Sequence, residues 1–212
     1  MPHTNPRRRR ELADAAIALL ASSGVHGLTH RTAETAAGLP AGTASNYFRS
    51  REALLVAAAE RIAELHYADM SQAAQQHQAA QQHQASAVPE TGQLPGSPGE
   101  QLVDLLAGSL LAATTVHRER YLAVVELLLE ARRRPALAAA LAGLQEIATG
   151  FTAGLHAELG LPIPASAVPT LMALYEGGLF TLLTALPEQA TEDAARTLAH
   201  AMVHGALPGW PG

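Results

Sequence analysis

Two groups of side chains in the first quarter of the sequence have the chemistry of nucleic-acid contacts. One is a run of four arginines, Arg7, Arg8, Arg9 and Arg10. These can pair with phosphates or reach into a minor groove, although a solubilising tail has the same composition. The other combines small hydrogen-bonding groups with a phenol and a guanidinium: Thr43, Ser45, Asn46, Tyr47 and Arg51. Such groups reach base edges and phosphates, so the sequence predicts a DNA-binding surface.

Signatures of catalysis and of metal binding are weak in this sequence. It has no cysteine, no Glu-x-x-His pair, no phosphate loop, no G-x-S-x-G elbow and no dinucleotide fingerprint. His200 and His204 are spaced to share one helix face, but chance or an interface explains them better than a metal. We therefore expect no catalytic residue, no cofactor, no metal and no enzyme.

Charge is distributed unevenly along the 212 residues. Residues 1–51 hold seven arginines and three acidic residues, a net charge of +4, whereas residues 52–212 hold seven arginines and sixteen acidic residues, a net charge of −9. A basic module on an acidic body is typical of a localised phosphate-binding face. No run approaches the roughly 20 apolar residues that a membrane span needs, so we expect a cytoplasmic protein without a membrane partner, associated with the nucleoid when bound to DNA.

Short helices must position the candidate contacts. Asn5 can cap a first helix that ends near Gly24, and Thr29 can cap a second that ends at Gly38. A third, polar helix is expected from Leu39–Pro40 to about Tyr47, with Ala44 and Phe48 towards the core. Ser50 can cap a fourth. This order predicts a helix-turn-helix.

The rest of the chain also reads as helical. Apolar stripes predict helices over about 100–116, 119–134, 136–159, 166–186 and 191–206. The AAQQHQ repeat at 73–84 is a frayed helical extension or a disordered insert. We expect an all-α fold with a DNA-binding domain at 1–50, a connecting fourth helix at 51–87, a Pro/Gly-rich loop at 88–99 and a helical effector-binding and dimerisation domain at 100–212.

Residues 8–62 resemble the tetracycline-repressor (TetR) family of bacterial transcriptional regulators. The matching motifs are Gly27-Leu28-Thr29, Ala36-Ala37-Gly38-Leu39, Gly42-Thr43, Tyr47-Phe48 and Ser50-Arg51-Glu52-Ala53-Leu54-Leu55. The resemblance implies a homodimer on a near-palindromic operator, with DNA contacts at Thr29, Arg31, Thr43, Tyr47 and Arg51. Ser45 and Asn46 match variable positions that could read bases. One departure is Pro40-Ala41, where the family often has Ser-Lys, which removes a side-chain cap from the third helix.

The C-terminal half resembles the family in organisation only. The last two long helices, about 166–186 and 191–206, are expected to pair with those of a second subunit, although burial within one subunit is the alternative. Polar groups amid apolar sequence are candidates for contacting a small apolar effector: Thr114, His117, Tyr121, Glu126, Glu130, His156, Tyr175 and Glu176. Glu126 and Glu130 could instead face solvent, and His156 could be an ordinary core or surface histidine.

These observations favour a ligand-responsive repressor that binds a palindromic operator as a dimer. An activator or an adaptor without DNA binding, built on the same fold, is the first alternative. A metal-dependent enzyme on a helical bundle is the second.

Overall fold

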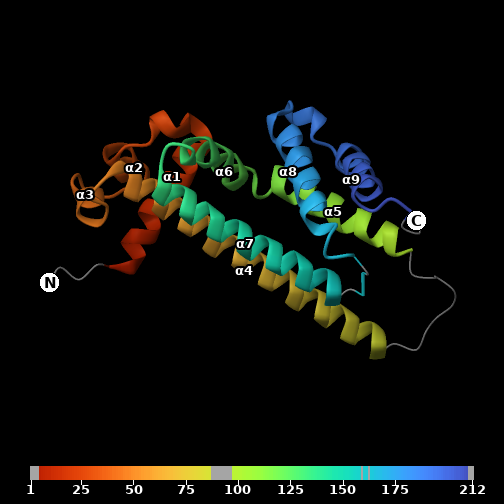
Figure 1. The fold of residues 1–212 in the computed structure, drawn as a ribbon. Helices are drawn as coiled ribbons and strands as arrows, with labels where there is room; N and C mark the ends of the chain where they lie inside the picture. Colours follow the sequence, from red (N-terminus) through yellow and green to blue (C-terminus); the bar gives the residue numbers. More distant parts are fainter. Residues whose placement is uncertain (1–4, 87–96, 159, 162, 210–212) are drawn as a thin grey trace. The chain divides into compact units, whose positions relative to one another are not determined.

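Only helices occur in the described part of the chain, as the sequence predicts. The computed structural model describes residues 5–86, 97–158, 160–161 and 163–209. In chain order the elements are α1 (Pro6–Gly27), α2 (His30–Ala36), α3 (Thr43–Tyr47), α4 (Arg51–Ser86), α5 (Pro98–Thr114), α6 (Arg118–Ala131), α7 (Pro135–Glu158), α8 (Val168–Thr184), the short 3-10 helix η1 (Pro187–Gln189) and α9 (Glu192–Ala206) (Figure 1).

The chain forms two compact units that are not contiguous in sequence. The first unit joins Met1–His66 to His117–Ile147, and the second joins Tyr67–Val116 to Ala148–Gly212. α6 therefore lies in the first unit with the N-terminal helices, although it follows α5 of the second unit in the chain. The long helices α4 and α7 run from one unit into the other. The domain boundaries expected from the sequence stay a prediction.

Side-chain caps begin the N-terminal helices at the predicted residues. Asn5 accepts from the Arg7 N–H at the start of α1, and Thr29 forms a capping box with Thr32 at the start of α2. Ser50 Oγ accepts from the Ala53 N–H at 3.1 Å at the start of α4. α1 breaks its helical geometry at Gly24, where φ is 64° and ψ −177°, and then makes one more turn to Gly27. This combination of dihedral angles is essentially restricted to glycine.

α3 is shorter than predicted. It begins at Thr43 rather than at Leu39–Pro40, because Gly42 is its N-cap with a left-handed φ of 83°. As predicted, Ala44 and Phe48 are buried in the core of the first unit. That core also contains Leu54 and Ile62 of α4 and Ala123, Leu127, Leu137 and Leu141 of α6 and α7, so the N-terminal helices share it with α6.

In the middle of the chain, the structure agrees with the expected helical extension through the AAQQHQ repeat and departs from the sequence-based expectation in two other places. α4 continues through the AAQQHQ repeat to Ser86, and α5 begins at Pro98 behind the cap Ser97. Residues 98–99 of the expected loop are therefore helical, and residues 87–96 lie outside the described residues. The second departure is Pro135–Gly154 of α7, which is long and apolar enough to cross a membrane by length and composition. One such helix is weak evidence for a membrane span. Leu137 and Leu141 of this stretch are core residues, although only 12% of its apolar window is buried.

In the second unit, α5, α8 and α9 pack together (Figure 1). Gly178 of α8 allows a close approach to α9, because a Cβ added there would lie 2.3 Å from Met202 Cε. Arg196 of α9 forms ion pairs with Glu100 and Asp104 of α5, with 3.0 Å between Arg196 Nη2 and Glu100 Oε2. These contacts account for the burial of Ala195, Ala199 and Met202 on the inner face of α9.

Candidate DNA-binding surface and effector residues

α3 has one buried and one exposed face. Ala44 is fully buried and Phe48, just past the end of the helix, is 2% exposed. Ser45 and Asn46 are exposed, and their side chains have no hydrogen bond to any residue in the described part of the chain. A hydroxyl and an amide are thus presented to solvent on a helix whose other face is held in a core. These groups have the donors and acceptors needed to read base edges.

A buried carboxylate holds the N-terminus of α3. Glu34 of α2 is 5% exposed, and its Oε1 accepts from the Ala44 N–H at 2.7 Å. Gly42, the N-cap, offers no side chain, so Glu34 supplies the cap that the Pro40-Ala41 departure removes. The sequence interpretation missed this role. The available signal was an acidic residue beside Ala33, Ala36 and Ala37 in an otherwise small and apolar stretch.

The hydroxyl groups at three other predicted contacts have local partners. Thr43 Oγ1 donates to the Pro40 carbonyl oxygen at 2.6 Å. Tyr47 Oη accepts from the Asn5 N–H at 3.2 Å, which ties the start of α1 to the end of α3. Thr29 Oγ1 accepts from the Thr32 N–H at 3.1 Å. Each oxygen still has capacity for a further hydrogen bond.

The predicted arginines fall into two groups. Arg7 pairs with Glu11 at 2.9 Å, and Arg9 pairs with Glu60 at 3.1 Å while lying 5.2 Å above the Phe48 ring. In contrast, three arginines are exposed and have no ion pair with any described residue: Arg8, Arg10 and Arg31. Arg49 shares these properties and was missed by the sequence interpretation. Its position between the motif residues Phe48 and Ser50 was the available signal.

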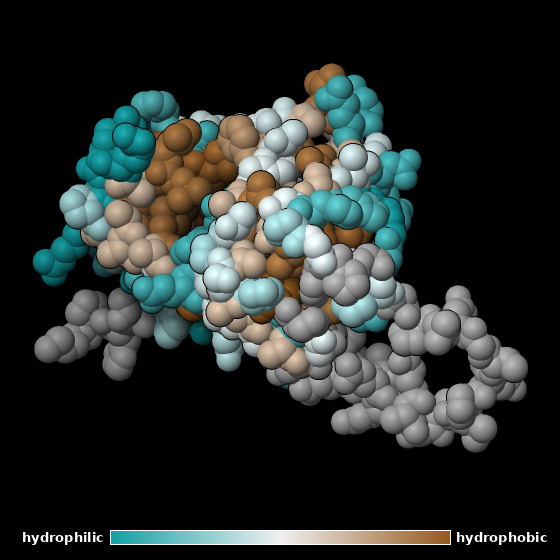
Figure 2. All heavy atoms as spheres, turned by 45° about the vertical axis from the view of Figure 1, so that its right-hand side comes forward, coloured by the Kyte–Doolittle hydropathy of each residue, from teal (hydrophilic) through white to brown (hydrophobic). Residues whose placement is uncertain are grey.

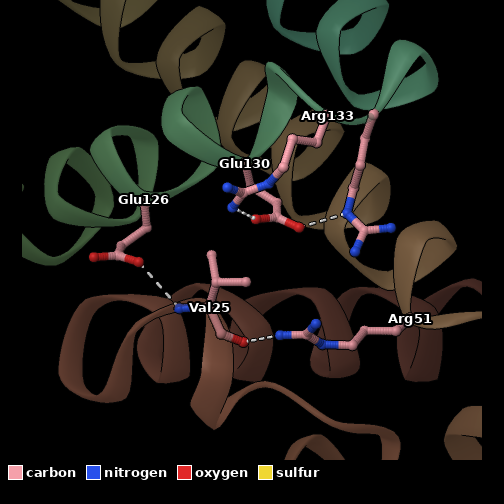
Figure 3. Close-up of polar contacts among 6 residues, drawn as sticks. Val25, Arg51, Glu126, Glu130 and Arg133 are labelled. Atoms are coloured by element: carbon pink, nitrogen blue, oxygen red, sulfur yellow. Dashed lines mark hydrogen bonds and ion pairs between the residues drawn. The ribbon is translucent and has the colours of Figure 1, made fainter.

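Arg51 differs from the other arginines. Its guanidinium is partly buried, and Nε donates to the Leu28 carbonyl oxygen at 2.8 Å while Nη2 donates to the Val25 carbonyl oxygen (Figure 3). Val25 lies in the last turn of α1, and Leu28 is the residue that follows this helix. The structure therefore uses Arg51 to satisfy backbone carbonyls at a helix end.

The eight predicted effector residues are divided between the two units. The first unit contains His117, Tyr121, Glu126 and Glu130, and the second contains Thr114, His156, Tyr175 and Glu176. In the first unit, Tyr121 makes an edge contact with His66, with ring centroids 4.9 Å apart. Glu126 Oε2 accepts from the Val25 N–H at 3.0 Å. This half of the set has structural partners within its own unit.

Glu130 does not face solvent, which was the alternative considered for it. Its side chain is buried and accepts from Arg133 and Arg134, each at 2.7 Å, at the end of α6 (Figure 3). The hydrogen bonds from Arg133 and then Arg134 lower the pKa of Glu130 from 4.5 to about 2, and burial opposes this shift. The pair of arginines thus keeps a buried carboxylate ionised.

In the second unit, the candidates differ in their surroundings. Thr114 is buried and donates to the Leu110 carbonyl oxygen at 2.8 Å, and Glu176 is exposed. His156 is 3% exposed, its Nδ1 has no partner in the described part of the chain, and desolvation lowers its pKa. Burial raises the pKa of Tyr175, whose hydroxyl lies 2.7 Å from Ser109 Oγ.

A hollow of about 360 Å³ opens in this unit, but none of the eight candidates lines it. Its walls come from the start of α8 and from the residues around the end of α9: Pro164, Ser166, Ala167, Thr170 and 206–209.

The outer face of α8 exposes apolar residues. Leu171, Leu179, Leu182 and Leu183 are buried within the second unit, whereas Leu174 is 39% and Phe180 52% exposed. The small residues Gly178, Ala195 and Ala199 of α8 and α9 are buried inside this unit. Figure 2 shows that apolar residues reach the molecular surface between hydrophilic areas. The apolar runs of α8 are therefore used partly for internal packing and partly remain exposed.

Known proteins share both sequence and fold with this chain. Residues 97–209 match the family model for the tetracyclin repressor-like C-terminal domain. No protein of curated function matches the sequence. The multidrug binding protein EbrR in complex with ethidium is 28% identical, with 92% of this chain and 98% of that chain covered and a TM-score of 0.59.

Two further solved structures share the fold. A protein of Rhodococcus sp. described as a TetR-family transcriptional regulator is 22% identical, with a TM-score of 0.65 and coverage of 94% and 98%. A Saccharomonospora viridis protein described as a transcriptional regulator, in complex with choline, is 16% identical, with a TM-score of 0.67 and coverage of 94% and 97%. The chain belongs to the TetR family of transcriptional regulators.

The Glu34 cap generates a prediction about stability. Glu34→Ala leaves the Ala44 N–H without its acceptor and should lower the free energy of unfolding by about 1.5–3 kcal/mol, as for hydrogen bonds to charged groups. Glu34→Gln keeps an acceptor oxygen and should lower it less. Urea unfolding followed by circular dichroism measures both, with Glu146→Ala on an exposed position as the control. Equal losses for the alanine and glutamine variants would contradict the cap.

The lowered pKa of Glu130 generates a pH prediction. Because the pKa in the folded protein is below the ordinary value, the carboxylate's contribution is fully present above about pH 4.5 and is lost as the pH falls towards 2. Glu130→Gln should therefore destabilise the protein at pH 7, and the difference from wild type should shrink between pH 4.5 and 2. Thermal unfolding across this range tests it. A difference that stays constant down to pH 2 excludes the charge as its cause.

Proposed function

We propose that this regulator is a ligand-responsive repressor that binds a near-palindromic operator as a homodimer. The observation that carries the proposal is the exposed face of α3, where Ser45 and Asn46 are presented on a helix fixed by Ala44, Phe48 and Glu34. In a helix-turn-helix the second helix reads the major groove through such residues. A repressor of this kind works in the cytoplasm, on nucleoid DNA.

The contacts divide by chemistry into base readout and phosphate binding. We assign readout to Ser45 and Asn46, since an asparagine amide pairs with adenine. We assign phosphate binding to the exposed arginines Arg8, Arg10, Arg31 and Arg49, with Tyr47 adding a single hydrogen bond through its hydroxyl proton, which the contact with the Asn5 N–H leaves free. Thr29 and Thr43 would first have to release the hydroxyl protons that they share with Thr32 and the Pro40 carbonyl. Arg7 and Arg9 are already paired with Glu11 and Glu60, so they contribute less.

A dimer supplies the second reading helix. Two copies of α3 must lie about 34–36 Å apart to enter successive major grooves on one face of the duplex. The exposed side of α8, with Leu174, Gly177 and Phe180, is the apolar surface that a second subunit would cover. α9 would contribute its own outward face. This interface corresponds to the two helices expected from the sequence.

A small-molecule effector fits the second unit. EbrR, 28% identical, is described as multidrug binding and was solved with ethidium, which supports a small-molecule effector here. The unpaired Nδ1 of the buried His156, together with the Tyr175 and Ser109 hydroxyls, offers polar groups for orienting such a molecule. The effector lowers operator affinity by binding one of two protein states more tightly than the other.

Arg49→Ala and Asn46→Ala should affect DNA binding in different ways. Loss of a phosphate contact at Arg49 should weaken binding to all duplexes and reduce the slope of log affinity against log salt by about 1. Loss of the Asn46 amide should change the preferred sequence by about 1–3 kcal/mol at one position. Gel shifts on the DNA that flanks the gene, and on single-base variants of it, measure both effects.

Arg132→Ala is the charge-matched control, because Arg132 is exposed but lies outside the N-terminal helices. The affinity of the Arg132→Ala protein for DNA, and the salt dependence of that affinity, should match wild type. If no duplex binds the wild-type protein even at low salt, the proposed function is wrong.

Phe180→Asp tests the interface. A charge on the exposed face of α8 should dissociate the dimer, because it would be desolvated against apolar side chains of the partner. Sedimentation velocity should then show a monomer with unchanged helicity. Leu129→Asp, at an apolar residue of α6 that is 62% exposed, is the matched control and should remain dimeric. A dimeric Phe180→Asp protein would place the interface elsewhere.

A further inference from the structure

The last turn of α1 and the residue after it, Val25–Leu28, are held from two sides by side chains of two other helices (Figure 3). Glu126 of α6 accepts from the Val25 N–H at 3.0 Å, and Arg51 of α4 donates to the carbonyl oxygens of Val25 and Leu28. We propose that Glu126 and Arg51 are positioning residues for DNA binding, which set the orientation of α2 and α3 without touching DNA. This inference rests on the proposed function.

The backbone of this turn needs outside partners. At Gly24 the backbone leaves the helical region, so the Val25 N–H takes its acceptor from a side chain. The Val25 carbonyl oxygen accepts from the Leu28 N–H at 3.2 Å and has a second lone pair for a side-chain donor. Arg51 and Glu126 supply a donor and an acceptor to the same residue, Val25. Because hydrogen bonds with an ionised partner are the stronger class, the pair fixes the peptide groups on both sides of Val25.

The turn leads directly to the reading helix. Thr29 caps α2 one residue after Leu28, and Glu34 of α2 holds the first turn of α3 through Ala44. Each link is a hydrogen bond to a backbone group at a helix end. A shift of Val25 therefore moves the start of α2 and, through Glu34, the face that presents Ser45 and Asn46.

The packing around Glu126 is close. A Cβ at Gly24 would lie 3.2 Å from Glu126 Oε2, closer than an ordinary van der Waals contact. Glu126 also belongs to α6, whose end is fixed by Glu130 and its two arginines, and α6 falls within the segment matched by the family's C-terminal domain model. A residue of the C-terminal sequence region thus contacts the backbone of the DNA-binding helices.

In this geometry Arg51 does not contact a phosphate, which is the role that the family resemblance implies for it. Its Nε and Nη2 already donate to two carbonyls of the partly buried turn. Turning them towards a phosphate would take the Arg51 donor from the Leu28 carbonyl and leave the Val25 carbonyl with the Leu28 N–H alone, which is costly in a partly buried place. Arg49, two residues earlier, is exposed and has no such engagement among the described residues.

Salt dependence distinguishes the two roles. We would measure the affinity of the full-length protein for a duplex that wild type selects from a random pool, at several salt concentrations. Arg51→Ala and Glu126→Ala should each weaken binding by about tenfold or more, equivalent to 1.4 kcal/mol, with the wild-type salt slope. Arg49→Ala should reduce the slope by about 1. Glu126→Gln, which keeps an acceptor oxygen, should bind within about threefold of wild type, or 0.65 kcal/mol.

A second readout does not depend on DNA. Amide hydrogen exchange at Val25 should accelerate in Glu126→Ala and remain slow in Glu126→Gln. If the alanine variant does not fold, Glu126→Asp replaces it, since its carboxylate is one methylene shorter and should also lose the Val25 contact while keeping the charge. The same loss of affinity at unchanged slope is expected.

Three results would overturn the inference. They are a slope reduced in Arg51→Ala as in Arg49→Ala, a wild-type affinity in Glu126→Ala or Glu126→Asp, and an unchanged Val25 exchange rate in those variants. All three can occur while wild type binds its duplex, so they leave the proposed function intact. Failure of wild type to bind any duplex removes both proposals.

Discussion

Short helices cannot satisfy their own ends, and this constraint governs the N-terminal part of the protein. In α3, which has five residues, most backbone N–H and C=O groups lack an intrahelical partner. Glu34 supplies a partner to α3. Other side chains do the same at the ends of α1, α2 and α4: Asn5, Thr29, Ser50, Arg51 and Glu126. Because several of these reach across the sequence, the caps also fix how the helices are arranged. The exposed face of α3 depends on these contacts.

The same constraint explains why arginines of one motif have different roles. The Arg51 guanidinium lies next to backbone carbonyls at a helix end and donates hydrogen bonds to them. Arg7 and Arg9 lie beside acidic residues and form ion pairs. The arginines left without such neighbours are available to an anionic ligand. Net charge alone could not separate these groups, since all of them contribute equally to the basic character of residues 1–51.

Features fixed by local sequence were predictable, and features that depend on long-range contacts were not. Caps at Asn5, Thr29 and Ser50, and the burial of Ala44 and Phe48, follow from neighbouring residues and were predicted correctly. The late start of α3 depends on the positive φ of Gly42, and the cap from Glu34 depends on how α2 meets α3. The Glu126–Val25 bond joins residues 101 positions apart, which no local pattern can indicate. The placement of α6 in the first unit has the same origin.

In α8, packing within the unit determines which apolar side chains remain exposed for an interface. An apolar run on a helix predicts burial but not the partner, because a core and a subunit interface need the same side chains. Once Leu171, Leu179, Leu182 and Leu183 are buried against the helices of their own unit, only Leu174, Phe180 and their neighbours remain exposed. Gly178 illustrates the division: a Cβ there would meet the flexible end of the Met202 side chain of the same chain, so this glycine faces its own unit. The proposed dimer could therefore use only the side of α8 that these internal contacts leave exposed, where Phe180 lies.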